Sequence, residues 1–351
     1  MLNTLVSTAE IAQFDTIIDV RSPAEFAEDH IPGAINLPVL DNEERARIGT
    51  LYKQVSPFEA KKQGAALVAR NIARHIEESC LDKPKDWKPL IYCWRGGNRS
   101  GSMTLIMNRI GWAARQLEGG YKAYRQQVLQ DLETCPATLD FRVICGLTGS
   151  GKSRLLAALQ SAGAQVLDLE GLAVHKGSVL GHVPGTPQPS QKYFESLLRQ
   201  ALAGFDPARP IFVEAESKKI GNVRAPDSLI EQMWQSRCLR LEANTAVRVQ
   251  LLREEYPHFI AEPEQLSEKL RFLTARYGKT QIDAWKHMAE DGQWDQLVSE
   301  LLEMHYDPSY TRSMMQHYPH YPDAPQLRVD TLEPDPFPAL AQQASALAQT
   351  H

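Results

Sequence analysis

The segment 141–153 reads FRVIC-GLTGSGKS, an apolar run followed by a glycine-rich loop. Its second part, Gly146–Ser153, is a complete Walker A pattern, in which glycines let backbone N–H groups point inward around phosphate oxygens. A phosphate-binding loop of this kind follows a strand and opens a helix. Phe141–Cys145 has the composition of a buried strand, and Lys152–Ser161 has helical spacing. The segment therefore predicts an α/β domain built around a phosphate site.

The Walker A loop predicts a di- or triphosphate ligand but does not identify the group attached to it. Lys152 is expected to reach the outer phosphate, and Ser153 is expected to hold Mg²⁺. An acidic partner for that ion is expected at the end of a neighbouring strand, where the sequence offers Glu214, Glu216 and, on another strand, Asp168. We favour Glu214 or Glu216, with a solvent-facing strand end as the alternative for each. The predicted phosphate-binding residues are Gly146, Thr148, Gly149, Ser150, Gly151, Lys152 and Ser153.

A second glycine-rich loop, Cys93–Ser100 (CWRGGNRS), follows the apolar run Pro89–Tyr92. Its glycines can turn several N–H groups toward one centre, and such a nest stabilises a thiolate and any anion bonded to it. Arg95 and Arg99 add positive charge to the same loop. We therefore predict that Cys93, Arg95 and Arg99 form a catalytic anion site. A buried structural cysteine is the alternative, but the polar loop after it disfavours a dry core.

Length and composition describe a globular protein of two domains. The chain has 351 residues, of which 43% are hydrophobic and 23% charged, and its net charge is −5. Five cysteines without a CxxC pair argue against a disulfide framework and a structural zinc site, so we expect a reducing cytoplasm. The sequence offers no apolar run long enough to span a bilayer and no signal-peptide pattern at its start, so no membrane association is expected.

Alternating strand-like and helix-like segments fill the first 130 residues and predict a mainly parallel α/β sheet. Periodicity is lost between 132 and 140, around Pro136, and we place the boundary there, giving domains 1–136 and 137–351. The second domain is expected to be a P-loop NTPase-like α/β fold with a helical part from about 245 to 304. From Tyr318 onward the chain is Pro-rich and then Ala-rich, which predicts a loosely packed, acidic tail.

Charge is unevenly distributed along the chain. Residues 139–289 contain 19 Lys or Arg and 16 Asp or Glu, whereas residues 290–351 contain 2 and 10. A slightly basic middle segment is compatible with a polyanion-binding face and equally with ordinary solvated surface. The candidate contacts to a polyanion are Lys218, Lys219, Arg224, Arg248 and Arg253.

Three motifs in the first domain resemble those of rhodaneses. They are DVRSPAEF at 19–26, HIPGAINLP at 30–38 and the Cys93 loop. Five residues separate Cys93 from Arg99, one more than in common single-domain rhodaneses. This larger loop resembles that of the related dual-specificity phosphatases, and we expect it to accept an anion larger than one sulfur atom.

A rhodanese domain joined to a P-loop domain that carries HKGS at 175–178 and PQPSQ at 187–191 resembles the tRNA 2-selenouridine synthase family. The resemblance implies that 2-thiouridine at the wobble position of Lys-, Glu- and Gln-type tRNAs is S-geranylated from geranyl diphosphate. Selenium from selenophosphate then replaces the geranylthio group. It also implies a substrate-closing loop, for which a plain connector is the alternative. The predicted loop residues are His175, Gly177, Ser178, Gln188, Ser190 and Gln191.

The same resemblance implies tRNA, selenophosphate and geranyl diphosphate as partners and a transient contact with selenophosphate synthetase. No tightly bound cofactor is expected, although the Walker A loop could take Mg²⁺. The main alternative is a rhodanese-type sulfurtransferase fused to an ATPase or kinase. A phosphatase is a weaker alternative, because Tyr92 stands where a histidine commonly precedes the phosphatase cysteine. A non-catalytic P-loop regulator is a third, and the intact thiol loop speaks against it. The sequence does not locate the geranyl groove.

Overall fold

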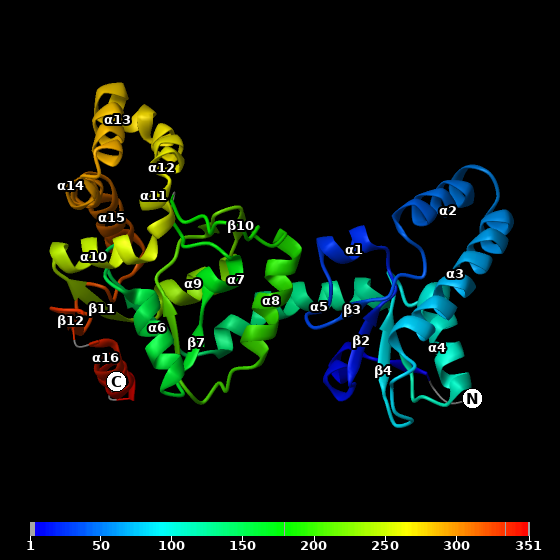
Figure 1. Cartoon of the computed structure of the whole chain (residues 1–351). Helices are drawn as coiled ribbons and strands as arrows, with labels where there is room; N and C mark the ends of the chain where they lie inside the picture. The colour runs from blue at the N-terminus through cyan, green and yellow to red at the C-terminus, as the bar shows by residue number, and fades with distance from the viewer. Residues whose placement is uncertain (1–3, 179, 334, 350–351) are drawn as a thin grey trace. The chain divides into compact units, whose positions relative to one another are not determined.

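The computed structural model describes residues 4–178, 180–333 and 335–349, which form two compact units (Figure 1). The first unit combines residues 1–131 with 190–200, and the second combines 132–189 with 201–351. The domain boundary expected at 136/137 therefore lies a few residues beyond the division between the units. Residues 190–200, expected in the second domain, pack with the first unit. The fold class is α/β, as predicted, with a parallel sheet in each unit.

The first unit contains a five-stranded parallel sheet in the order β1-β5-β4-β2-β3. Asp19 at the end of β2 is in register with Tyr92 at the end of β4, so these strands finish at one edge and Cys93 follows there. Its strands are β1 (Leu5–Val6), β2 (Thr16–Asp19), β3 (Ile35–Asn36), β4 (Pro89–Tyr92) and β5 (Arg115–Leu117), and its helices are η1 (Thr8–Gln13), α1 (Pro23–Glu28), α2 (Asn42–Gln54), α3 (Pro57–Ser79), α4 (Asn98–Ile110) and α5 (Gly120–Thr134).

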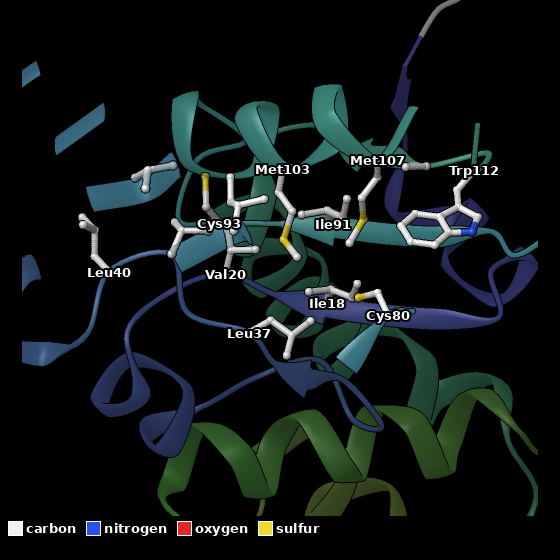
Figure 2. Close-up of a cluster of buried hydrophobic side chains, with 14 of the residues drawn as sticks. Ile18, Val20, Leu37, Leu40, Cys80, Ile91, Cys93, Met103, Met107 and Trp112 are labelled. Atoms are coloured by element: carbon white, nitrogen blue, oxygen red, sulfur yellow. The ribbon is translucent and has the colours of Figure 1, made fainter. Parts of the chain in front are cut away.

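A hydrophobic core between the sheet and helices α3 and α4 positions the cysteine. Ile18 and Ile91 on adjacent strands lie beside Met103 and Met107 of α4, as Figure 2 shows. Cys93 belongs to the same cluster and is only 3% exposed. The expectation that the polar loop would keep this cysteine out of the core is therefore wrong: Cys93 is buried where the core meets the loop.

The first part of α8 (Gln191–Ala203) belongs to the first unit because the buried Asp29 holds it there. One carboxylate oxygen of Asp29 accepts from Ser196 at 2.9 Å and the other accepts from Tyr121 at 2.7 Å. Both hydroxyls donate, so the buried charge has two hydrogen bonds that offset its loss of hydration. This buried aspartate thus explains why a segment distant in sequence packs here.

The second unit contains a five-stranded parallel sheet in the order β12-β11-β6-β8-β7, with β6 at its centre. Its strands are β6 (Phe141–Cys145), β7 (Gln165–Leu167), β8 (Ile211–Glu214), β11 (Arg237–Ala243) and β12 (Gln326–Val329), beside an antiparallel hairpin of β9 (Lys219–Ile220) and β10 (Val223–Arg224). Its helices are η2 (Cys135–Thr138), α6 (Lys152–Ser161), α7 (Leu169–Ala173), α9 (Asp227–Gln235), α10 (Thr245–Glu255), α11 (Pro257–Ala261), α12 (Pro263–Leu270), η3 (Arg271–Leu273), α13 (Thr274–Glu290), α14 (Trp294–Leu301), η4 (Leu302–Tyr306), α15 (Asp307–His317) and α16 (Phe337–Gln349).

The expectation of a loosely packed tail is wrong. β12 extends the sheet by pairing in parallel with β11, and α16 buries Phe337, Leu340 and Ala344 in the core that it shares with α6. The alanines favour helix and let α16 approach α6 closely. The composition of the tail did not reveal this helix, because proline and acidic residues in the stretch before it suggested loose packing.

Helices α10 to α15 form the helical part that the sequence predicted between 245 and 304. They enclose a core of their own, centred on the fully buried Trp285 together with Leu270 and Leu297. Among the described residues, no helix is both long and apolar enough to cross a membrane.

Candidate functional site

The Walker A loop joins the central strand β6 to α6 and has the geometry of a phosphate cradle. Gly149 and Gly151 have φ angles of +77° and +89°, a left-handed region that side chains rarely adopt. A Cβ at Gly151 would lie 2.6 Å from the Phe337 ring, so glycine is required there by packing as well. The Lys152 ammonium bonds back to the Gly146 carbonyl at 3.0 Å and is positioned to turn toward a phosphate. Ser150 is buried at the centre of this loop.

Two residues from distant helices hold the loop in place. The backbone N–H of Gly146 donates to the hydroxyl of Tyr310 at 2.8 Å. Arg248 donates to the Thr148 carbonyl at 2.8 Å and forms a two-pronged ion pair with Asp307, at 2.9 and 2.6 Å. Arg248 is 3% exposed, so its assignment as a tRNA contact is wrong, and it supports the phosphate loop instead.

Three carboxylates meet beside the loop. Glu170, Glu214 and Glu216 each offer an oxygen, and these oxygens lie within 4.8 Å of one another. Glu214 is 1% exposed, and within the described residues its Oε1 has no hydrogen-bond partner. Ser153 donates to Glu170 at 3.5 Å, a long contact that connects this acidic trio to the phosphate loop. Oxygen ligands in this arrangement suit Mg²⁺.

Burial raises the pKa of each member of the acidic trio, and neighbouring carboxylates add to the rise for Glu170 and Glu214. Burial and the nearby Glu216 raise the pKa of Glu170 to about 8. Burial also raises the pKa of Glu214 well above its ordinary value, with Glu170 and Glu216 adding to the rise. Burial raises the pKa of Glu216, opposed chiefly by Lys152. Near neutral pH the trio therefore binds protons, or a cation that replaces them.

The sequence indicated Glu214 and Glu216 as acidic partners of the phosphate loop but gave no indication of Glu170. Asp168, its competing candidate, lies outside the acidic trio: it is exposed and caps α7 by accepting from the Gly171 N–H at 2.8 Å. Glu170 lies just beyond the end of β7, which pairs with β8. That adjacency was the available signal, because neighbouring parallel strands end at one edge of a sheet. Tyr310 had no signal in the sequence.

Part of the expected substrate loop lies at the phosphate site. Gly177 has a φ of +62°, and a Cβ there would lie 2.3 Å from a Glu216 oxygen, so its backbone presses onto the acidic trio. Gly177 and Ser178 line the cleft formed by the Walker A loop and the acidic trio, here called the phosphate cleft. The His175 N–H donates to the Glu170 carbonyl at 3.0 Å, which fixes the loop to α7.

The other predicted loop residues have structural partners. The Gln188 amide donates to the carbonyls of Ala173 and Ile220, at 2.9 and 3.1 Å, and so ties the loop to the β9–β10 hairpin. Ser190 and Gln191 belong to the first unit. There the Ser190 hydroxyl donates to the Glu28 carbonyl.

An apolar cleft opens directly beside the phosphate cleft. Its cavity volume is about 70 Å³, and it is lined mainly by helices α10, α11, α12 and α14, with Leu266, Trp294 and Val298 among its walls. The two clefts are adjacent, because five residues line both: Thr148, Ser178, Leu252, Tyr256 and Tyr306.

The Cys93 loop presents donors to its sulfur. The Gly97 N–H and the Ser100 hydroxyl donate to the Cys93 Sγ at 3.3 and 3.1 Å, and both lie at the start of α4. Gln116 braces the loop by donating to the Gly96 carbonyl at 2.6 Å. Gly120 packs so tightly on this loop that a Cβ would lie 2.3 Å from the Cys93 carbonyl oxygen. Donors at a helix N-terminus suit a bound anion.

The two loop arginines differ in their surroundings. Arg99 forms an ion pair with Glu25 at 3.0 Å and is 18% exposed. That ion pair, opposed by burial, lowers the pKa of Glu25, which Arg45 also approaches, at 3.7 Å. Arg95 is exposed, and in the described ranges it has no acidic partner. Arg95 is therefore the loop cation that is immediately available to an incoming anion.

The remaining candidates for tRNA contact lie at the surface of the second unit. Lys218 pairs with Asp227 at 2.9 Å, and Arg253 pairs with Asp295 at 2.7 Å. Exposed pairs of this kind are weak and can exchange for a phosphate contact. Lys219 and Arg224 are exposed on β9 and β10.

The fold and its two sites define an α/β protein with a thiol-centred anion loop in one unit and a phosphate-binding loop beside an apolar cleft in the other. A family model described as the tRNA 2-selenouridine synthase AAA domain matches residues 139–321, and one described as the rhodanese-like domain matches residues 3–127. The chain belongs to the tRNA 2-selenouridine synthase family.

Curated relatives carry the same family name. Those of Nitrosomonas europaea and Alcanivorax borkumensis are 36% and 39% identical, each over 68% of this chain. The chain spans 63% and 66% of those two relatives, slightly less than two thirds of their length. A relative from Shewanella halifaxensis is 31% identical over 84% of this chain and 87% of its own length.

We predict that Ser100→Ala slows alkylation of Cys93. The variant loses one hydrogen bond of ordinary strength to the sulfur. The rate at which Cys93 reacts with iodoacetamide at pH 7.5 should therefore fall about three- to tenfold. Mass spectrometry of the Cys93 peptide measures this rate. Ser102→Ala, two residues further along α4 and therefore on another side of the helix, is the control and should leave the rate unchanged. An unchanged rate in Ser100→Ala would show that this hydroxyl does not stabilise the thiolate.

The proton held by Glu170 predicts a pH-dependent stability. The pKa of Glu170 is raised in the folded state. Its protonated side chain therefore contributes fully to the free energy of unfolding below about pH 4.5, and this contribution is lost as the pH rises toward 8. Without added metal, Glu170→Gln should unfold near the wild-type temperature at pH 5 and several degrees above it at pH 8.5. Thermal unfolding measures the difference, with the exposed Glu268→Gln as control. A difference that is constant with pH would contradict the raised pKa.

Proposed function

We propose that this protein is a tRNA 2-selenouridine synthase that modifies wobble 2-thiouridine in Lys-, Glu- and Gln-type tRNAs by two successive transfers in the cytoplasm. Geranyl diphosphate supplies the first group and selenophosphate the second. The observation that carries the proposal is that the phosphate cleft and the apolar cleft share five lining residues. A nucleoside triphosphate has a polar sugar next to its phosphates, whereas a prenyl diphosphate has an apolar chain attached directly to its charged head.

The geometry supports a binding mode for geranyl diphosphate. Its diphosphate would lie in the Walker A loop against Lys152, and its ten-carbon chain would extend past Leu252 and Tyr256 into the apolar cleft. Burial of apolar carbon is worth about 0.8 kcal/mol per CH₂, so the tail contributes strongly to binding. The reacting carbon would then lie near the residues that line both clefts.

In the first transfer, the sulfur of 2-thiouridine bonds to C1 of the geranyl group, and the bond between C1 and the diphosphate oxygen breaks. Negative charge grows on the leaving diphosphate, where Lys152 and the inward-pointing N–H groups of the loop stabilise it. The acidic trio and Ser153 have the oxygen donors to hold Mg²⁺, which when bound would neutralise further charge on the diphosphate.

In the second transfer, the Cys93 loop positions selenophosphate. The Gly97 N–H and the Ser100 hydroxyl lie at the thiol, and Arg95 supplies exposed positive charge beside it. These donors suit an anion with a tetrahedral phosphate group. The selenium of selenophosphate bonds to C2 of the base while the C2–S bond breaks and releases geranylthiol, and water then cleaves the Se–P bond, which leaves selenium on the base and releases phosphate. All five cysteines are free thiols, in keeping with work in a reducing compartment.

Separate variants are predicted to block separate transfers. Lys152→Ala should slow geranylation of 2-thiouridine tRNA by about a hundredfold or more, because it removes a charge that stabilises the leaving group. It should still convert chemically geranylated tRNA to selenouridine. Cys93→Ser should still geranylate 2-thiouridine tRNA but should fail to convert geranylated tRNA to selenouridine. Mass spectrometry of wobble nucleosides measures both steps. Unimpaired geranylation by Lys152→Ala, or tRNA-independent ATP hydrolysis at a comparable rate, would contradict the proposal.

Filling the apolar cleft is predicted to alter the preferred chain length. Val298→Trp should reduce kcat/KM for geranyl diphosphate about four- to fifteenfold, because one or two carbon units lose their burial. The shorter dimethylallyl diphosphate should be affected less than threefold. Leu129→Trp, on an exposed position of the first unit, is the control. An equal loss with both substrates would show that the tail lies elsewhere.

A further inference from the structure

Helices α2 and α3 form a helical arm, residues 42–79, whose two ends differ in their packing. At its base, Leu67 and Ile72 of α3 lie in the core of the first unit, and Asn71 donates to the Val39 carbonyl at 3.1 Å. Further out, α3 packs on α2, and the two helices project from the sheet (Figure 1). Phe58, near the turn, is about 21 Å along the helix axis from Ile72. The outer half of the arm is thus a two-helix projection anchored by its base.

Positive charge is concentrated in the middle of the arm. Residues 42–79 hold seven Lys or Arg and five Asp or Glu, but four of these acids lie near the ends of the segment, at 43, 44, 77 and 78. Between 45 and 74 all seven basic residues remain and only Glu59 is acidic, and Glu59 is already paired with Lys62 at 2.6 Å. Such a local excess of positive charge attracts polyanions.

Several of these cations are exposed and unpaired. Lys53, Lys61 and Arg70 are exposed, and in the part of the chain that the structure describes none of them has an acidic partner. A lysine that serves only to stabilise a helix commonly pairs with an acid one turn away. These side chains instead present free positive charge at the surface.

Large apolar side chains are exposed between the cations. Tyr52, Val55 and Phe58 surround the turn between the two helices and are 53%, 72% and 67% exposed. Lys62 lies 5.1 Å from the centre of the Phe58 ring. Aromatic faces interleaved with lysines bind unpaired bases by stacking while the lysines contact the phosphates. A protein partner would fit the apolar turn but would need an acidic surface to match the arm.

We propose that the helical arm is an RNA-docking surface of this protein that holds the substrate tRNA by its phosphates and by stacking on Phe58 or Tyr52. The proposal rests on the proposed function for the identity of the RNA. The arm is a docking surface in the first unit, separate from the candidate tRNA contacts that lie in the second unit. Binding through the arm is separate from the chemistry at Cys93 and Lys152, so the two can be tested separately.

The test measures tRNA binding by the full-length chain in fluorescence anisotropy at several salt concentrations. Lys53→Glu combined with Lys61→Glu should weaken binding about tenfold or more and flatten the slope of log Kd against log salt by about one to two. Phe58→Ala should weaken binding about fivefold or more with little change in slope. The control is Lys85→Glu combined with Lys88→Glu, which makes the same charge change at exposed lysines off the arm and should bind more tightly than the arm variant.

The outcomes separate the arm from the proposed function. Arm variants that bind tRNA like the matched control would overturn the docking surface and leave the proposed function standing. A wild-type chain that binds no tRNA would overturn both. Arm variants that bind tRNA normally, but lose activity only when selenophosphate is supplied by its synthetase, would overturn RNA docking in favour of a protein partner. Thermal unfolding confirms that each variant is folded.

Discussion

The buried ion pair between Arg248 and Asp307 is the interaction on which the second unit depends. Through one guanidinium it joins α10 to α15 and holds the Thr148 carbonyl, so the Walker A loop is fixed from outside. Both clefts inherit their shape from this arrangement, because Thr148 lies on their common wall. An arginine that is 3% exposed would cost folding free energy if it had no partner. Asp307 and the Thr148 carbonyl both accept hydrogen bonds from the Arg248 guanidinium and so offset that cost.

Each unit builds an anion site in the same way. A parallel sheet ends all its strands at one edge, a glycine-rich loop leaves the sheet there, and a helix begins beyond it. The difference lies in the side chain at the centre. In the first unit a thiol sits among donors at the start of α4, which suits transfer of a soft atom. In the second unit a lysine and an acidic trio border the glycine-rich loop, where we propose that a diphosphate leaving group is held.

The acidic trio shows why the second site is sensitive to its ligand. Burial raises the pKa of all three carboxylates, and repulsion between them adds to the rise for Glu170 and Glu214, so the trio favours protons or a bound cation. Gly177 presses its backbone onto the same carboxylates. A change of charge in the trio therefore acts at close range on the loop around Gly177, which borders the phosphate cleft.

The sequence by itself determined the local parts of this protein. The Walker A pattern between Phe141–Cys145 and Lys152–Ser161 and the Cys93 loop after Pro89–Tyr92 specify strand, loop and helix through short-range backbone requirements. It also identified Glu214 and Glu216, because strand ends can be read from apolar runs.

Only the tertiary structure decided which distant residues meet these loops. Composition indicated a loose tail, but one face of α16 is buried, because its alanines are small enough to pack on α6. Arg248 reads in the sequence as a surface cation and is buried by its pairing with Asp307. Glu170 and the apolar cleft arise from contacts between segments far apart in the chain. Such contacts depend on shape and burial in three dimensions, which periodicity and motif spacing do not encode.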